Sequence, residues 1–178
     1  NLSFTYNNPI HSISSAEGYE EDVMGATMDA YLNGFEDPRR AVFFALSSNG
    51  NYRGLRNGHK NGDIFKGDEG LSKPNIQQGT PYIWMTAAEV FFLRAEGALK
   101  QWDMKGTPEA LYKSGIRASF EQHGVKNVEN YLVSTKVPAR YPGFKASPSA
   151  PAPSDITVVW NTNSTKKQLE QIITQKWI

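Results

Sequence analysis

The sequence predicts a mainly α-helical protein in which a pair of helices supports long irregular loops. Two observations favour the helices: apolar residues recur at a spacing of three and four over residues 86–102, and again over residues 107–124. A third observation favours the loops, because residues 49–80 are rich in glycine and residues 138–153 hold five of the ten prolines.

The composition excludes several classes of function. The chain has 178 residues, which is the size of one domain and enough to bury a core. Lys and Arg number 19 against 18 Asp and Glu, so the net charge is +1 and no nucleic-acid partner is expected. The lack of cysteine excludes thiol nucleophiles, cysteine-ligated zinc and disulfides. No apolar run is long enough to span a bilayer, and the mean hydropathy is -0.53.

The first part of the chain is predicted to hold one short helix between irregular segments. Residues 1–21 are expected to form a loop with one extended piece, since Asn, Ser, Pro and Gly interrupt the apolar residues. A helix is predicted over residues 22–32, and Asn33-Gly34 suits the left-handed cap at its end. After a turn at residues 37–40, the apolar run over residues 41–46 is predicted to be buried.

The helix pair has the clearest start signals. Thr86 and Glu89 have the spacing of a capping box, and Thr107 followed by Pro108 places a cap before a proline at the first helical position. Small residues on both helices favour a close antiparallel hairpin over about residues 86–124, of the type found in tetratricopeptide repeats. These small residues are Ala95, Ala98, Gly115, Ala118 and Ser119. One such unit cannot bury its apolar face alone.

The last third of the chain is predicted to contain an extended segment, followed by a short strand and a helix. The proline-rich residues 138–153 favour an extended excursion over the surface. Residues 157–160 are predicted to form a short strand, and a last helix is predicted after Ser164-Thr165. Neither end has the features of a natural terminus, because the chain opens at Asn1 without a methionine or signal peptide and closes within a helical pattern.

Four segments resemble the SusD/RagB family of outer-membrane nutrient-binding lipoproteins in their order and rough separation. They are residues 28–40 (MDAYLNGFEDPRR), 85–99 (MTAAEVFFLRAEGAL), 112–119 (YKSGIRAS) and 172–177 (IITQKW). The resemblance reaches from near residue 20 to the end of the chain and covers the proline-rich segment least. It implies a SusD-like helical scaffold with a tetratricopeptide-like helix pair, in which residues 1–178 are part of a single domain and form a C-terminal fragment.

The resemblance also implies a location and a function. A member of this family is a surface-exposed or periplasmic-facing lipoprotein of the outer membrane, which it contacts through a lipid anchor that would lie outside this chain. It binds oligosaccharides or polysaccharides for nutrient uptake through a TonB-dependent, SusC-like transporter, and it catalyses nothing. Two alternatives stay open: a protein-interaction scaffold of tetratricopeptide type that binds no glycan, and an enzyme that acts on one.

Sugar binding requires flat aromatic faces for C–H surfaces and polar side chains for hydroxyl groups. Such residues gather in and beside the glycine-rich loop, with one more in the proline-rich segment. The candidate ligand-binding residues are Tyr52, Arg53, Arg56, Asn57, His59, Tyr82, Trp84 and Tyr141. The structural alternative is that Tyr52 and Trp84 merely cover the scaffold.

Other site chemistries have less support. The glycine spacing over residues 50–58 fits neither a dinucleotide fingerprint nor a P-loop, and the three histidines lack the spacing of a zinc motif. No metal or cofactor is assigned, although a calcium site using Asp63, Asp68 and Glu69 is left open. No catalytic pair stands out among the 18 acids. Arg39 and Arg40 are expected to anchor their loop to a nearby acid rather than to hold a ligand.

Overall fold

The computed structural model describes residues 8–14, 22–58, 70–145 and 147–178. Within these ranges the regular structure is helical, with only isolated β-bridges beside the helices. The helices are α1 (Pro9–Ser14), α2 (Ala26–Gly34), α3 (Arg40–Phe43), α4 (Ala87–Leu99), α5 (Pro108–Gln122), α6 (Val128–Leu132) and α7 (Thr165–Trp177). The predicted mainly α fold class is confirmed. None of the described helices combines the length and the hydropathy that a membrane crossing requires.

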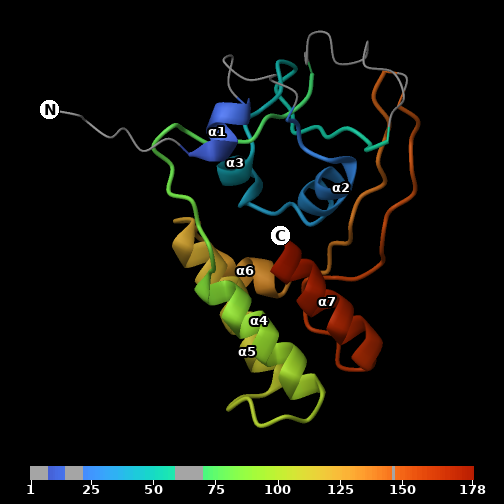
Figure 1. Ribbon diagram of the computed structural model, residues 1–178. Coiled ribbons are helices and arrows are strands. Elements are labelled where there is room, and N and C mark those ends of the chain that lie inside the picture. Colours follow the sequence, from blue (N-terminus) through green and yellow to red (C-terminus); the bar gives the residue numbers. More distant parts are fainter. Residues whose placement is uncertain (1–7, 15–21, 59–69, 146) are drawn as a thin grey trace, which may run out of the picture.

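The molecule has a helical half and a loop-rich half (Figure 1). In the helical half, α4 and α5 pack side by side and α7 lies against both. The Thr86 hydroxyl accepts a hydrogen bond from the Glu89 amide at 2.9 Å, and the Thr107 hydroxyl accepts one from the Ala110 amide at 3.2 Å. These caps satisfy amides that helix starts leave unpaired. The predicted helix pair is therefore confirmed.

The main hydrophobic core joins the two helices of the pair to α7 and to the segment before it. Phe92 from α4, Ile116 from α5 and Ile172 from α7 are fully buried in one cluster. Ile156 and Val158, which precede α7, close the cluster from the side. Apolar burial between the elements stabilises this half, because each helix presents one apolar face to its neighbours.

A buried charged network connects the loop-rich half to the helical half. The Arg39 guanidinium donates to both carboxylate oxygens of Asp37, at 3.0 and 2.6 Å, and both side chains are fully buried. It also donates to Ser119 of α5 at 2.9 Å and to Gln175 of α7 at 2.8 Å. The hydroxyl of Tyr131 in α6 donates to Asp37 at 2.6 Å. The expectation that Arg39 anchors its loop to an acid is confirmed.

The loop-rich half is organised around α2. The amide of Gly54 donates to the buried Asp29 carboxylate at 2.6 Å, which ties the described part of the glycine-rich loop to the helix. On the other side, the amide of Ala139 donates to the Ala30 carbonyl at 2.8 Å and holds the start of the proline-rich excursion. The two loops, which are far apart in sequence, therefore flank one helix.

Four expectations from the sequence are wrong. Asn33-Gly34 is not a left-handed cap, because α2 runs through both residues and ends at Phe35 in a right-handed conformation. The run over residues 41–46 is not buried, since Leu46 is 56% exposed and α3 contains no buried residue. Residues 157–160 form no strand, because side chains of α5 and α7 take up their carbonyl groups: Tyr112 donates to Val158 at 2.8 Å and Gln171 donates to the two flanking residues. Part of the first segment is helical, as α1, rather than a loop.

Candidate functional site

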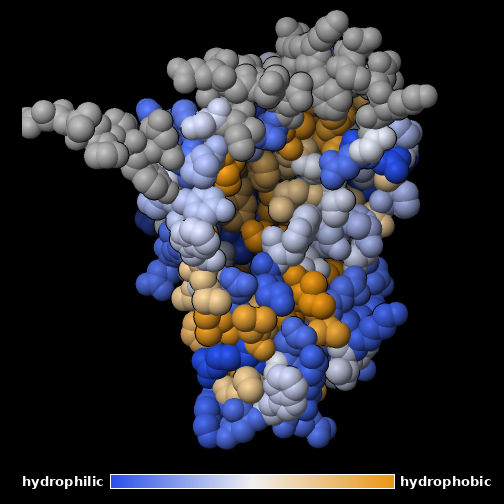
Figure 2. All heavy atoms as spheres, in the orientation of Figure 1, coloured by the Kyte–Doolittle hydropathy of each residue, from blue (hydrophilic) through white to orange (hydrophobic). Residues whose placement is uncertain are grey.

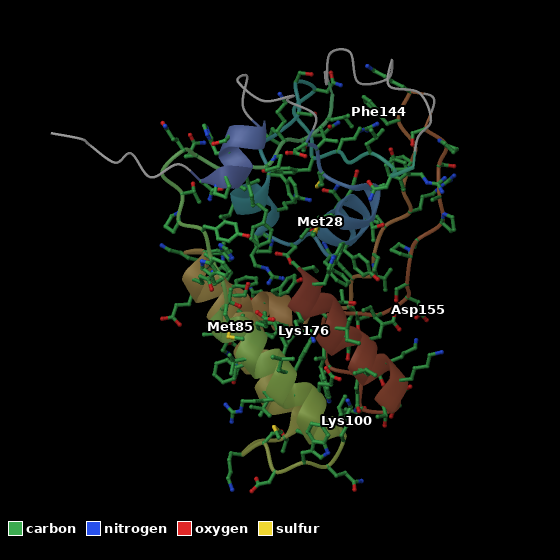
Figure 3. The ribbon with its side chains drawn as sticks, viewed as in Figure 1. Met28, Met85, Lys100, Phe144, Asp155 and Lys176 are labelled. Carbon is green, nitrogen blue, oxygen red and sulfur yellow. The ribbon has the colours of Figure 1, made fainter. Side chains whose placement is uncertain are left out.

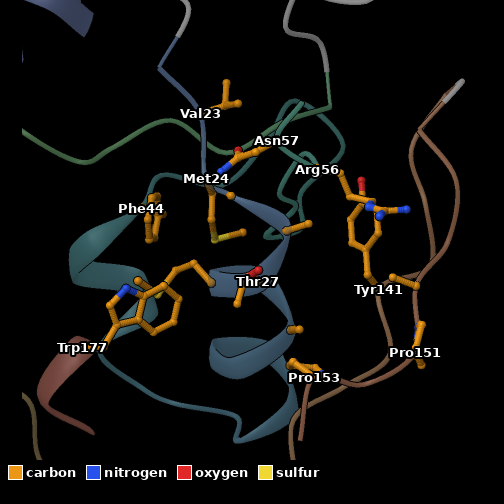
Figure 4. A pocket seen from close by; sticks show the side chains of 15 residues that line it. Val23, Met24, Thr27, Phe44, Arg56, Asn57, Tyr141, Pro151, Pro153 and Trp177 are labelled. Atoms are coloured by element: carbon orange, nitrogen blue, oxygen red, sulfur yellow. The ribbon is translucent and has the colours of Figure 1, made fainter. Parts of the chain in front are cut away.

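An open groove of about 620 Å³ crosses the outer face of α2 (Figure 4). We call it the α2 groove. Thr27 and Met28 of the helix are among its lining residues, and Phe44 and Trp177 lie together along one side. Across α2, the lining residues are Ala150, Pro151, Pro153 and Tyr141, with Arg56 beside Tyr141. The groove thus receives side chains from α2, from the end of α7 and from both flanking loops.

The indole of Trp177 is the largest apolar surface offered to the groove. Trp177 is 49% exposed at the end of α7, and its ring packs edge-on against Tyr31 of α2 with 5.8 Å between the centroids. This contact fixes the orientation of the indole while half of it stays open. A fixed, half-open aromatic face is the geometry on which a flat apolar surface of a ligand can stack.

Arg56 and Asn57 supply the polar end of the groove. They follow Leu55, whose amide donates to Met24 at 2.8 Å and whose carbonyl accepts from Ala26 at 2.8 Å. This pairing fixes the backbone beside the start of α2. In the part of the chain that the structure describes, neither side chain makes a hydrogen bond or an ion pair. A guanidinium and an amide are therefore free to bind a ligand at this end.

Tyr141 has a supporting position in the wall. Its side chain is 2% exposed, and its hydroxyl donates to the Gly54 carbonyl at 3.1 Å. Burial raises the pKa of the Tyr141 hydroxyl, so the group remains a neutral donor. The bond links the proline-rich excursion to the glycine-rich loop and thereby fixes the width of the groove.

The structure brings together only some of the residues that the sequence singled out. Arg56, Asn57 and Tyr141 line the α2 groove. Tyr52 lies instead beneath the Arg40 guanidinium, 5.0 Å from it, which agrees with a covering role. His59 lies outside the described residues.

Two further candidates, Arg53 and Tyr82, lie away from the groove lining. The Arg53 guanidinium lies 5.8 Å from the ring centre of Phe144, which Figure 3 places at the loop-rich end of the molecule. Tyr82 and Trp84 pair edge-on, with 5.6 Å between centroids, in the segment before α4. Trp84 is 91% exposed, so it does not cover the scaffold.

Sequence reasoning missed Phe44 and Trp177. Both were assigned to helical or apolar runs, and their position beside α2 depends on contacts between distant segments. The one signal in the sequence was the four-residue spacing of Ile173 and Trp177, which places both on one face of α7.

Metal chemistry has no support in the described ranges. Among those residues, no group of three or more His, Asp or Glu side chains could hold a metal ion. The calcium site left open at Asp63, Asp68 and Glu69 falls outside the description of the structure.

A second exposed feature is an apolar face on the helical half, which we call the α4–α7 face. Val90 and Leu93 of α4 are 41% and 44% exposed, and Ile173 of α7 is 47% exposed. Figure 2 shows hydrophobic spheres gathered over these two helices. Lys176 of α7 reaches Glu96 of α4 at 3.7 Å and bridges the helices beside this face. Apolar groups at three-residue spacing on a helix are typical of a packing surface.

The comparison with family models identifies the chain's relatives. A model described as SusD-like, Susd and RagB outer membrane lipoprotein, matches residues 1–178. The chain belongs to the SusD-like family. This family consists of outer-membrane lipoproteins, which places the SusD-like chain at the outer-membrane surface. None of the curated proteins compared with it matches significantly.

Solved SusD-like structures share the fold. A chitin-binding SusD homolog from Flavobacterium johnsoniae is 37% identical, with a TM-score of 0.87 over 99% of this chain and 37% of its own. A susD homolog from Bacteroides thetaiotaomicron is 40% identical, with a TM-score of 0.80 over 86% of this chain and 34% of its own. A SusD homolog from Bacteroides uniformis is 34% identical, with a TM-score of 0.85 over 97% of this chain and 38% of its own. The SusD-like chain described here thus spans about a third of the length of these relatives.

Proposed function

We propose that this SusD-like chain helps to bind oligosaccharides at the outer-membrane surface and that the α2 groove is part of the binding site. The observation that carries the proposal is the arrangement, across one helix, of the half-open Trp177 indole and the side chains of Arg56 and Asn57, for which the described residues supply no hydrogen-bond partner. An aromatic face and planar polar groups are the two components that sugar recognition requires.

The comparisons support the same class of ligand. The relative from Flavobacterium johnsoniae, which matches 99% of this chain, is described as chitin-binding. Catalysis is not part of the proposal. Glycoside hydrolysis uses a pair of carboxylates beside the scissile bond, and no Asp or Glu is among the described residues that line the groove. Following the family resemblance, we extend the proposal to delivery of the sugar to a TonB-dependent, SusC-like transporter.

Calorimetric titration with a panel of soluble oligosaccharides tests the proposal. We expect at least one glycan to bind, and we expect Trp177→Ala to weaken that binding by about tenfold through loss of the stacking face. Arg56→Ala should weaken it through loss of a hydrogen-bonding group. Trp102→Ala is the matched control, because Trp102 is 60% exposed and lies outside the groove lining. A folded chain that binds no glycan in the panel contradicts the proposal.

A protein-interaction scaffold is the second candidate function, and the α4–α7 face is the observation that favours it. The occupant that fits is an amphipathic helix from the part of a SusD-like protein that this chain does not span. Two facts support this occupant: the chain covers about a third of its solved relatives, and a single tetratricopeptide-type pair leaves one apolar face unburied.

Co-purification tests this second function. The probe is the portion of the Flavobacterium johnsoniae relative that the chain does not match, and we expect it to be retained by the tagged chain. Leu93→Glu should abolish retention without unfolding the chain, because Leu93 is 44% exposed. Lys166→Glu, on the exposed start of α7, is the charge-changing control. Failure of the wild-type chain to retain the probe, or equal retention by Leu93→Glu, contradicts the scaffold function.

A further inference from the structure

The sequence holds four Asn-Gly pairs, at residues 33–34, 49–50, 57–58 and 61–62. Asparagine before glycine is chemically labile, because glycine has no Cβ atom to keep its backbone nitrogen away from the asparagine side chain. The structure describes the first three pairs, whereas the pair at residues 61–62 lies outside the described ranges. The three described pairs differ in how far the surrounding structure protects them.

The labile step requires the glycine nitrogen to reach the side-chain carbonyl carbon of the asparagine. The nitrogen bonds to this carbon and gives up its proton, while the C–N bond of the side-chain amide breaks, so ammonia leaves and a cyclic imide remains. Water then opens the imide at one of its two carbonyl groups, which gives aspartate or isoaspartate. Hydrogen bonds that hold the amide side chain, or that occupy the glycine nitrogen, oppose this attack.

The first pair, Asn33-Gly34, is protected on both sides of the reaction. The Asn33 side chain donates to the Tyr52 carbonyl at 3.1 Å and accepts from the Arg40 guanidinium at 2.9 Å. Gly34 lies within α2, where a backbone N–H points along the helix axis to a carbonyl of the preceding turn. The backbone is also closely packed, since a Cβ atom on Gly34 would lie 2.2 Å from the Ala139 nitrogen.

The second pair, Asn49-Gly50, is protected chiefly at the glycine. The Gly50 amide donates to the Ser47 carbonyl at 2.9 Å, and the Ser47 amide donates to the Asn51 carbonyl at 2.9 Å. The attacking nitrogen is thus occupied within a turn. The Asn49 side-chain nitrogen packs against the backbone of Gly70, where a Cβ atom would lie 2.7 Å from it.

The third pair, Asn57-Gly58, has neither kind of protection. Both residues are exposed, and in the described part of the chain neither the Asn57 side chain nor the Gly58 amide makes a hydrogen bond. Gly58 has a φ of 80°, and nothing lies within 4 Å of its Cβ position. The nitrogen and the side-chain amide are therefore free to approach each other.

We propose that Asn57 is a site of spontaneous deamidation, which places a carboxylate in the lining of the α2 groove. The new acid is the chain neighbour of Arg56, in a lining whose described residues include no other carboxylate. An opposite charge at this distance offsets the charge of the guanidinium, and the formal net charge of +1 on the chain disappears. The chemistry depends on Asn57 and Gly58 and not on what the groove binds.

Peptide mapping after incubation in warm, mildly alkaline buffer tests the proposal, because mass spectrometry detects the conversion of an amide to a carboxyl group. A parallel sample unfolded in guanidinium chloride gives the rate of each pair without protection. We expect Asn57 to convert at nearly the same rate in both samples, Asn49 more slowly in the folded chain, and Asn33 only in the unfolded chain. Protection of Asn57 as strong as that of Asn33 overturns the proposal. Trypsin places the four pairs in separate peptides, which are residues 1–39, 41–53, 57–60 and 61–66.

Ion-exchange chromatography follows the new charge in the intact, folded chain. Asn57→Gln retains an amide, but attack on glutamine would close a larger ring, which forms more slowly. This variant should therefore accumulate less of the acidic form than the unsubstituted chain. Asn163→Gln is the matched control, because Asn163 is exposed and precedes Ser164 rather than a glycine. Equal accumulation of the acidic form in Asn57→Gln and in the unsubstituted chain places the modification elsewhere and also overturns the proposal.

Discussion

Phe92 of α4 occupies the space where Gly115 of α5 would carry a side chain. A Cβ atom on Gly115 would lie 2.6 Å from the Phe92 ring, which is closer than side-chain carbons approach in proteins. The contact lets the backbones of α4 and α5 come together and brings a fully buried aromatic ring to the centre of the pair. The hairpin that supports both halves of the molecule depends on this fit.

Substitution of Gly115 by alanine should separate the two helices. We expect Gly115→Ala to lower the free energy of unfolding by about 1–3 kcal/mol, the usual cost of overpacking a core. Urea denaturation measures the change, and Gly79→Ala is the control because nothing lies within 4 Å of its Cβ position. A second substitution, Phe92→Leu, should recover part of the loss. Equal stability of the two alanine variants would contradict the packing described above.

Removal of the Arg39 guanidinium should be far more costly than removal of an exposed one. In Arg39→Met, the buried Asp37 carboxylate loses its partner, so the free energy of unfolding should fall by about 3–5 kcal/mol. Arg117→Met breaks the exposed pair with Glu129 and should cost much less, because water already solvates and screens both charges. Thermal or urea unfolding followed by circular dichroism distinguishes the two. Restoration of stability by Asp37→Asn in the Arg39→Met background would confirm that the unpaired charge causes the loss.

Gln171 should be required for the segment that the sequence predicted as a strand. Its amide donates to the carbonyls of Thr157 and Val159, each at 2.7 Å, and its carbonyl accepts from the Asn161 amide at 3.0 Å. Gln171→Leu removes the partners of the Thr157 carbonyl and the Asn161 amide, whereas the Val159 carbonyl still accepts from the Thr157 hydroxyl at 3.0 Å, and the loss should cost about 1–3 kcal/mol. Gln122→Leu, at an exposed position, should be close to neutral. Hydrogen exchange should become faster at Asn161 in the first variant only, and uniform exchange in both would refute the role of Gln171.

His123 should make the chain less stable in mild acid. Burial, assisted by the positive charge of Arg39, lowers the pKa of His123 below its ordinary value of 6.5. As the pH falls below about 6.5, the unfolded chain therefore takes up a proton that the folded chain resists, and the free energy of unfolding falls. Replacement by glutamine should flatten this decline, measured by urea denaturation between about pH 7.5 and pH 5. An equally steep decline in His123→Gln would exclude His123 as its source.

The helical half could be predicted from local sequence because its signals are local. Threonine caps and apolar periodicity mark α4 and α5, and a serine cap with the same periodicity marks α7. The Thr157–Trp160 segment was mistaken for a strand because its β-branched residues favour extended structure, whereas its hydrogen-bond partner is a side chain 14 residues away. Residues 41–46 were predicted to be buried because apolar runs usually are. In the structure these residues are not buried, and the fully buried side chain next to them is that of Arg39.

The candidate site was predictable only in part, because its residues come together through contacts between distant segments. Arg56, Asn57 and Tyr141 were selected because their side chains suit sugars, and the selection said nothing about where they lie relative to one another. Trp177 has an equally suitable side chain, but it was assigned to the last predicted helix, and helical spacing does not show what its indole faces. Its place beside α2 depends on the contact with Tyr31 and on the network around Arg39, both of which join segments more than 100 residues apart.

The exposure of Trp84 gives the molecule a built-in optical reporter. An indole that is 91% exposed emits at the long-wavelength limit for tryptophan and is readily quenched by small solutes in the surrounding water. Because Trp84 stands directly before α4, any surface that settles on this end of the helix pair would shift its emission to shorter wavelengths. In a variant whose other three tryptophans, at positions 102, 160 and 177, are replaced by phenylalanine, occupancy there can thus be followed by fluorescence without attaching a label.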